Sequence, residues 1–267
     1  MGRIGFFDSG FGGLSVLKEV RSLMPLYNFI YLADTRNAPY GELSQEEIFE
    51  HTRRGVEFLF DRGAVVVVLA CNTASSEALR KLQQEFLPKF IGRKILGVII
   101  PAVEEAIVNT KNNRIGVLAT TATINSHAFE REVRKLSNAS VFEIPAPKLV
   151  PLIEEGEVSG EEIELLISEY VAEVIKNNID TLILGCTHYG IVDDLIAKYS
   201  GGVKIIQEGE VVARKLRDYL ERHSDIDNGL NKDSSIKFFT TGEASKFDII
   251  GSKIFGSDIK SAKIDLI

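Results

Sequence analysis

Cys71 and Cys186 are the only two thiols among the 267 residues, and each follows a short apolar run. Cys71 lies in "LACNTAS" after a valine-rich run, and Cys186 lies in "ILGCTHY". In both places hydroxyl or amide residues follow, and then a stretch that we expect to be helical. A helix N-terminus stabilises negative charge and lowers the pKa of a thiol from about 8.5 toward neutrality. We therefore predict two reactive thiols, each able to act as a base.

Other roles for the two cysteines have less support. Buried, inert thiols are common, but two cysteines in equivalent contexts favour reactivity. We expect no structural disulfide, because we expect a reducing compartment. Cys186 and His188 form a C-x-H pair without a second cluster, so we expect no metal. A dithiol redox protein usually carries C-x-x-C, which this sequence lacks.

The segment "DSGFGGLS" at 8–15 follows the first apolar run and precedes a helical pattern. This order places Asp8 and exposed backbone N–H groups at the carboxyl end of a strand, where open α/β sheets bind ligands. The segment is neither a G-x-G-x-x-G motif nor a Walker loop, so we expect no dinucleotide site. A tight glycine-rich turn with Asp8 as a helix cap is the alternative interpretation.

Two further features lie near these motifs. "NAPYGELS" at 37–44 is a proline-containing loop before a capped helix, and alone it indicates only a turn. His188 is suited to orient or protonate a group beside Cys186. His51, His127 and His223 lie on polar helical stretches, and we interpret them as surface residues without a role.

Short apolar runs alternate with helical periodicity along the chain, which predicts an α/β fold with mostly parallel strands buried on both faces. Ser44 with Glu47 and Ser159 with Glu162 fit capping boxes, and Gly63 marks a helix end. The runs are "RIGFF", "NFIYLA", "AVVVVLA", "KILGVII", "RIGVLA", "TLILG" and "VKII".

A weak internal repeat indicates two similar α/β domains. "RIGFFDSG" at 3–10 matches "RIGVLATT" at 114–121, and "AVVVVLACNTAS" at 64–75 matches "DTLILGCTHYG" at 180–190. Chance similarity among Val/Ile-rich strands is the alternative. We predict a first domain of residues 1–97 plus 208–267, which delivers Cys71, and a second domain of residues 98–207, which delivers Cys186.

Charge and hydropathy exclude several partners. The chain has 31 basic and 38 acidic residues and no Lys/Arg-rich tract, so we expect no nucleic-acid binding. No apolar run approaches the roughly 20 residues that span a bilayer, and the N-terminus does not fit a signal peptide. We expect a soluble, cytoplasmic protein that does not bind membranes.

The motifs, taken together, resemble the glutamate racemase family within the aspartate/glutamate racemase superfamily. The matches run in order across nearly the whole chain, and "CNTAS" with "ILGCTHY" is the most specific pair. The sequence departs from the usual family pattern at Gly190, at Lys148 and in "IIQEGEVVA". The matching stretches are "GFFDSGFGGLSVL", "LADTRNAPYG", "LACNTAS", "GVIIPAVEEA", "IGVLATTATINS", "LVPLIEEG", "DTLILGCTHYG" and "FFTTGE".

The resemblance implies two α/β domains that face each other across a cleft, with Cys71 and Cys186 on opposite sides of one amino acid. It also implies cofactor-independent interconversion of L- and D-glutamate for peptidoglycan synthesis, and a homodimer. Aspartate racemase, another racemase of the superfamily and a silent amino-acid-binding regulator are the alternatives. The residues implied to assist the thiols are Asp8, His188 and Glu154, and those implied to bind substrate are Asp8, Ser9, Pro39, Tyr40, Gly41, Asn72, Thr73, Thr120, Thr121, Thr123, Thr187 and His188.

Two thiols suit racemisation because a proton leaves one face of the α-carbon and another arrives on the opposite face. No motif suggests a lysine that would bind pyridoxal phosphate, so neutral hydrogen-bond donors must stabilise the charge that builds on the carboxylate. We predict that Asp8 supports proton transfer at Cys71 and that His188 supports it at Cys186.

Overall fold

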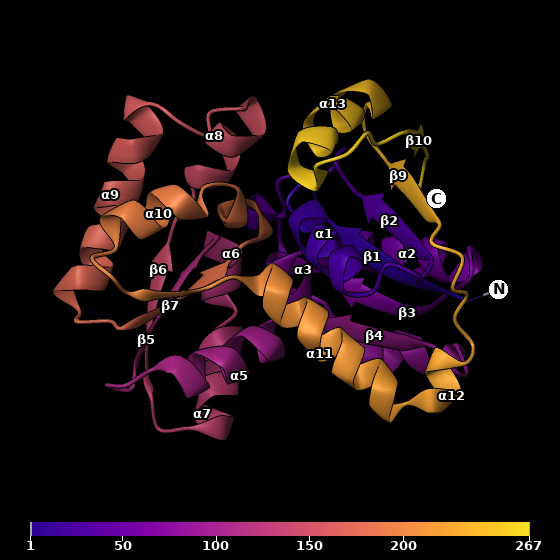
Figure 1. Ribbon diagram of the computed structural model, residues 1–267, viewed down its shortest axis with the longest axis horizontal. Helices are drawn as coiled ribbons and strands as arrows, with labels where there is room; N and C mark the ends of the chain where they lie inside the picture. The colour runs from indigo at the N-terminus through magenta and orange to yellow at the C-terminus, as the bar shows by residue number, and fades with distance from the viewer. Residues whose placement is uncertain (1, 267) are drawn as a thin grey trace.

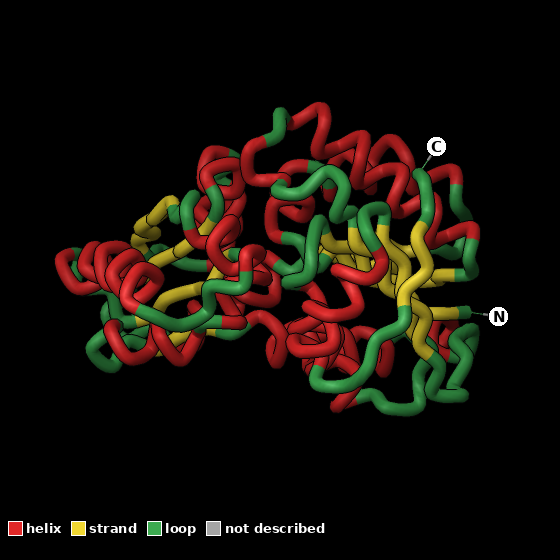
Figure 2. Tube along the Cα trace, turned by 90° about the horizontal axis from the view of Figure 1, so that it is seen from above, coloured by secondary structure: helices red, strands yellow, loops and turns green. Residues whose placement is uncertain are grey.

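The structure, a computed structural model, describes residues 2–266 of the chain. Its strands form two separate parallel sheets, one of six strands and one of four (Figures 1 and 2). Helices cover both sheets, so the predicted α/β class with two parallel-sheet halves is confirmed. Among the described residues, no helix is long and apolar enough to cross a membrane.

The first sheet is built around β1, whose two neighbours along the sheet are β2 and β3. Every strand pair in it is parallel. The strands in spatial order are β10 (Ser261–Lys263), β9 (Ile236–Thr240), β2 (Phe29–Ala33), β1 (Arg3–Asp8), β3 (Ala64–Leu69) and β4 (Lys94–Gly97).

Successive side chains of β1 point to opposite faces of this sheet, as strand geometry requires. Ile4 and Phe6 join a core with helices on one face, whereas Phe7 joins the core on the other face. All three are fully buried, and each such side chain stabilises the fold by about 1.5–3 kcal/mol. One core contains α1 (Gly13–Leu23), α11 (Glu208–Arg222) and α13 (Ala244–Phe255), and the other contains α2 (Gln45–Asp61) and α3 (Asn72–Glu77).

The second sheet repeats this layered arrangement. Leu182 and Leu184 of β7 face one core, and Ile183 faces the other. The strands in spatial order are β6 (Ser140–Pro145), β5 (Arg114–Ala119), β7 (Thr181–Gly185) and β8 (Lys204–Ile206). One face is covered by α8 (Leu149–Glu155), α9 (Glu161–Lys176) and α10 (Asp193–Tyr199), and the other by α5 (Ile99–Asn109) and α7 (Ala128–Leu136).

Helix α11 connects the two halves. It follows β8 and then packs along α1, next to the first sheet (Figure 1). Val211 belongs to a core of the second sheet, whereas its neighbour Val212 belongs to a core of the first. The chain then returns to the first sheet, where β9 pairs with β2. The predicted domain limits at 97/98 and 207/208 fall at the two crossings, and the division into domains stays a prediction.

One of the two predicted capping boxes forms. The Ser44 side chain accepts from the backbone N–H of Glu47, and the Glu47 carboxylate accepts from the N–H of Ser44 at 2.9 Å. The box at Ser159 was wrong, because α9 begins at Glu161 with Gly160 in the capping position. Gly160 has φ +117°, which glycine adopts readily and other residues rarely do. The helix therefore begins after Gly160, and Ser159 lies before the capping position.

Helix α2 ends at Asp61, and Gly63 follows with φ +87°, as predicted for a helix end. The remaining short elements are η1 (Tyr40–Glu42), α4 (Leu79–Lys81), η2 (Leu82–Phe86), η3 (Leu87–Lys89), α6 (Thr121–Asn125), η4 (Thr187–Ile191) and α12 (Ser224–Asp227).

Candidate active site

Cys71 lies directly beyond the carboxyl end of β3 and caps the N-terminus of α3. Its Sγ accepts a hydrogen bond from the backbone N–H of Ala74 at 3.4 Å, and the Ser9 hydroxyl lies 3.4 Å from the same sulfur. The residue is buried, with 5% of its surface exposed. The thiol is therefore held by the glycine-rich turn after β1 as well as by its own helix.

The prediction of a lowered pKa for Cys71 was wrong. Burial, followed by the charge of Asp8, raises the pKa of this thiol from 9.0 to about 12. The hydrogen bonds from Ser9 and Ala74 lower it, but by less. Desolvation outweighs the helix N-terminus because the apolar surroundings penalise the thiolate and α3 is only six residues long. Cys71 is therefore a thiol at neutral pH.

Cys186 lies directly beyond the carboxyl end of β7 and is 7% exposed. The predicted helical stretch follows it as a short 3-10 helix and then α10. The Nδ1 atom of His188 lies 3.8 Å from its Sγ, and the Nε2 atom of the same ring lies 3.1 Å from Oε1 of Glu154 in α8. The Cys186 thiol, the His188 imidazole and the Glu154 carboxylate are thus linked by two consecutive contacts.

This chain of contacts sets the charge of His188. Burial lowers the pKa of the imidazole, but the hydrogen bonds to Cys186 and Glu154 raise it more, and the result lies well above 6.5. Its two neighbours therefore favour the charged form of His188. A cation at this position stabilises negative charge that forms on the neighbouring sulfur.

The glycine-rich turn after β1 packs directly against the second half of the molecule. A Cβ atom on Gly10 would lie 2.8 Å from Oε1 of Glu154, and one on Gly12 would lie 2.7 Å from the backbone nitrogen of His188. Real Cβ atoms do not approach other atoms so closely. Gly10 and Gly12 are required because a Cβ atom would clash with the second half of the molecule, and not because their backbone has a positive φ.

Asp8 is fully buried beneath this turn. It accepts hydrogen bonds from the backbone N–H of Gly10 at 2.9 Å and from the Thr187 hydroxyl at 3.2 Å. Burial raises the pKa of its carboxyl group, although His188 and these hydrogen bonds act in the opposite direction. The alternative interpretation of Asp8 as a helix cap is confirmed in part: Gly12 is the residue at the capping position, but the Asp8 carboxyl group accepts a hydrogen bond from the backbone N–H of Gly13, the first residue of α1.

Both thiols line one narrow cavity of about 60 Å³. Two of the predicted site residues lie outside its wall: Asp8 is buried under the turn, and Thr123 lies behind Thr120 at a distance of 3.0 Å between hydroxyl oxygens. The predicted residues in the wall are Ser9, Pro39, Tyr40, Gly41, Cys71, Asn72, Thr73, Thr120, Thr121, Glu154, Cys186, Thr187 and His188. The sequence analysis missed Glu42, Pro147, Val150 and Pro151.

Hydroxyl groups join the two sides of the cavity. The hydroxyl of Thr73, in α3, lies 3.0 Å from that of Thr120 and 3.2 Å from that of Thr123. Thr120 caps α6 in the second half of the molecule. These bonds hold the Cys71 side of the cavity against the end of β5.

Asp34 anchors the predicted substrate loop, and the sequence analysis missed it. Its carboxylate accepts from the Tyr40 hydroxyl at 2.6 Å, from the Asn37 amide at 3.0 Å and from the Thr241 hydroxyl at 2.7 Å. Asp34 is fully buried. Asp34 and Thr241 belong to the quoted motifs "LADTRNAPYG" and "FFTTGE". In both motifs a polar residue follows an apolar run, and this position is the sequence signal that could have identified them.

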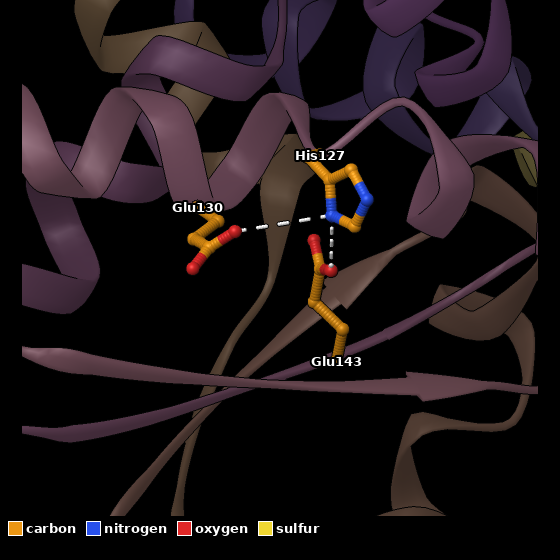
Figure 3. A group of neighbouring side chains, drawn as sticks. All are labelled: His127, Glu130 and Glu143. Carbon is orange, nitrogen blue, oxygen red and sulfur yellow. Dashed lines mark hydrogen bonds and ion pairs between the residues drawn. The ribbon is translucent and has the colours of Figure 1, made fainter.

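The three histidines without a predicted role lie outside this cavity. His127 is exposed, and its Nδ1 lies 3.1 Å from Glu143 and 3.8 Å from Glu130 (Figure 3). These three side chains could offer ligand atoms to a metal, but Glu130 is already paired with Arg134 at 2.6 Å. His51 and His223 are both half-buried, and each lies against a tyrosine ring, Tyr40 and Tyr219 respectively.

The fold and the site together define an α/β protein with two facing halves, in which a strand end from each half delivers one thiol to a shared cavity. Such a pair provides two proton-transfer groups on one small molecule. The sequence profile of the Asp/Glu/Hydantoin racemase family matches residues 16–216. The chain belongs to this family.

Individual relatives agree with this assignment and with the resemblance of the motifs. The chain is 39% identical to the glutamate racemase of Persephonella marina over 264 residues, which are 98% of this chain and 97% of that protein. A glutamate racemase structure from Bacillus anthracis has a TM-score of 0.89 at 34% identity and covers 99% of this chain and 98% of its own. The Francisella tularensis glutamate racemase in complex with D-glutamate has a TM-score of 0.88 at 34% identity, with 99% and 97% covered.

Proposed function

We propose that this chain is a glutamate racemase that interconverts L- and D-glutamate by proton transfer between two thiols, without a cofactor. The observation that carries the proposal is the position of Cys71 and Cys186, which come from different halves of the molecule and line the same narrow cavity. The family membership and the glutamate racemases that match nearly the whole chain support the same reaction.

The reaction needs one proton acceptor and one proton donor on opposite faces of the α-carbon. In one direction a thiolate takes the α-proton, so that the C–H bond breaks and an S–H bond forms. The other thiol then gives its proton to the opposite face of the carbanion and becomes a thiolate. Positioned groups replace a collision with a base from solvent, which supplies much of the rate enhancement.

Substrate binding is needed to activate Cys71. Without a ligand, burial and the charge of Asp8 keep this thiol protonated. A bound amino acid brings an ammonium group into the cavity that Cys71 lines, and this positive charge offsets the penalty that burial and Asp8 impose on a thiolate. Activation on binding limits the time during which a free thiolate is exposed to oxidation.

Neutral donors stabilise the carbanion. Ser9, Thr73 and Thr187 line the cavity, and among the described residues no arginine does so. Hydrogen bonds to a carboxylate that gains charge in the transition state are strongest where water is excluded. The small volume of the cavity supports such exclusion.

The contacts of the two thiols favour different helpers. Asp8 acts electrostatically on Cys71, whereas His188 contacts the sulfur of Cys186. We propose that Cys71 exchanges the proton of D-glutamate and Cys186 that of L-glutamate. Asp8→Asn and His188→Asn should then lower kcat unequally in the two reaction directions, as measured at saturating concentrations of each enantiomer. Equal losses in both directions for both variants would contradict this assignment.

The first test is incubation of the purified protein in D2O, without cofactor, with L-glutamate or separately with L-aspartate. We expect α-deuterium incorporation and D-glutamate by chiral chromatography, and the loss of both in the matched variants Cys71→Ser and Cys186→Ser. Turnover of aspartate alone would favour aspartate racemase. Binding of glutamate without exchange would favour the binding regulator.

We also propose that the product D-glutamate serves peptidoglycan synthesis, that the protein is cytoplasmic and that it forms a homodimer. Expression in a bacterium that requires D-glutamate should remove the requirement, and Cys71→Ser should not. Cell fractionation tests the location. Light scattering at several protein concentrations tests the dimer, and a single species with the mass of one chain would contradict it.

A further inference from the structure

Glu208 is a buried carboxylate that the proposed chemistry does not use. It is the first residue of α11, it follows the carboxyl end of β8, and 5% of its surface is exposed. Its Oε2 accepts a hydrogen bond of 2.7 Å from Nδ2 of Asn72, a residue 136 positions earlier in the chain. Asn72 follows Cys71 and lines the cavity that holds both thiols.

The pair also separates two cavities. Asn72 lines the small cavity between the thiols, and Glu208 lines a larger one of about 490 Å³ beside α1 and α13. Cys186 and Thr187 line both cavities. The hydrogen bond between Asn72 and Glu208 therefore lies between the two cavities, close to the thiols that transfer the proton. Replacing either side chain should affect that proton transfer.

Each member of the pair has an unsatisfied buried atom. Among the described residues, neither Oε1 of Glu208 nor Oδ1 of Asn72 has a hydrogen-bond partner. Two acceptors left without a donor are costly in a buried place. A proton on Oε1 would turn that atom into a donor, and the unsatisfied Oδ1 belongs to the group that Glu208 already contacts. A neutral carboxyl group can therefore pair with the amide through both of its oxygens.

The surroundings favour this neutral form. Burial, and secondarily the charge of Asp8, raise the pKa of Glu208 to about 8, although the Asn72 bond lowers it. No cation is hydrogen-bonded to the carboxylate within residues 2–266. The other titratable groups that line the larger cavity are Lys18 and Glu19 of α1, Cys186, Asp193 of α10, Glu210 of α11 and Lys253 of α13.

We propose that Glu208 is a positioning residue for the racemisation, which fixes the side-chain amide of Asn72 and therefore the groups that this amide presents to a bound amino acid. A free amide can turn by half a rotation and exchange its donor and acceptor ends. A carboxyl group that pairs with both ends of the amide hinders this rotation, because turning the amide would break both hydrogen bonds. This inference rests on the proposed function, because it needs a substrate in the cavity between the thiols.

The variants Glu208→Gln and Glu208→Ala separate the possible roles. Glutamine offers Asn72 one acceptor and one donor, as a neutral carboxyl group does, but it does not titrate. Alanine offers neither. We expect Glu208→Ala to lower kcat/KM for glutamate about tenfold, the equivalent of one hydrogen bond. We expect Glu208→Gln to match the wild type at pH 6.5 and to exceed it above pH 8, where the wild type loses the proton.

Two controls make the test specific to Asn72. Glu132→Gln makes the same chemical change at another buried glutamate, which lies in α7 and pairs with Arg80 and Lys135, and it should leave the pH profile unchanged. In a double-mutant cycle, Glu208→Ala should add little to Asn72→Ala, because both remove the same contact. Fully additive effects, or a kcat/KM of Glu208→Ala equal to that of the wild type, would overturn the proposal.

A measurement without substrate separates failure of this proposal from failure of the proposed function. The side-chain amide signals of Asn72 in nitrogen-15 NMR spectra should shift with a midpoint near pH 8 in the wild type and stay constant in Glu208→Gln. If the wild type does not racemise glutamate but the signals titrate, the proposed function fails and the contact stands. If the signals do not titrate in an active enzyme, the positioning role of a protonated Glu208 is refuted.

Discussion

The replacement of Glu208 by glutamine should stabilise the protein at alkaline pH. The folded state holds the pKa of this carboxyl group at about 8, whereas its ordinary value is 4.5. Because the folded state binds the proton more tightly than the unfolded state does, the wild type loses stability as the pH rises from 4.5 to 8. Glutamine keeps a similar shape and does not titrate, so the variant escapes this loss.

The magnitude follows from the difference between the two pKa values. At about 1.4 kcal/mol per pH unit, the loss approaches about 5 kcal/mol above pH 8, as an upper limit. That amount is a large part of the 5–15 kcal/mol or so by which typical proteins are stable. The free energy of unfolding of Glu208→Gln minus that of the wild type should therefore increase by several kcal/mol between pH 5 and pH 9.

Urea unfolding followed by circular dichroism at pH 5, 7 and 9 measures this difference. The control Glu132→Gln should show no such increase over this pH range, because hydrogen bonds and charge from Lys135 and Arg80 outweigh burial and lower the pKa of Glu132 below 4.5. The stability that Glu132 contributes is lost only at more acidic pH. A stability difference for Glu208→Gln that is the same at all three pH values would refute the reasoning, because it would mean that Glu208 does not titrate between pH 5 and 9.

Three further predictions concern the cavity. Cys71→Ser and Cys186→Ser should each lower kcat by at least about a thousandfold, because serine is a poor base at neutral pH; a loss below tenfold in D2O exchange would contradict the two-thiol mechanism. Gly12→Ala should raise KM and lower the melting temperature, because its Cβ would meet the backbone of His188, and unchanged kinetics and melting would show that the two halves can move apart at no cost. Asp34→Ala should destabilise the protein by roughly 2–4 kcal/mol in urea unfolding, because the buried hydroxyls of Tyr40 and Thr241 and the half-buried amide of Asn37 lose their acceptor. Asp34→Asn should retain part of that stability, and equal losses in the two variants would contradict this account.

Local sequence was sufficient to predict the fold class and the position of both thiols. A valine-rich run such as 64–69 suits a strand buried on both faces, and a residue that follows such a strand must lie at the edge of a parallel sheet. Cys71 and Cys186 each follow one of these strands, so their placement at two sheet edges was contained in the pattern. The capping box at Ser44 was predictable for the same reason, since all its partners lie within one helical turn.

Properties that depend on distant residues needed the tertiary structure. The pKa of Cys71 is raised because the packed surroundings exclude water and bring Asp8 near, and neither effect appears in the seven residues of "LACNTAS". Asp34 and Glu208 gain their roles from partners about 200 and 136 positions away. Short-range pattern determined which strand ends carry the two thiols, and only the folded chain decided the other residues of the cavity and the pKa of Cys71, because desolvation and contact between distant segments arise when the two halves pack together.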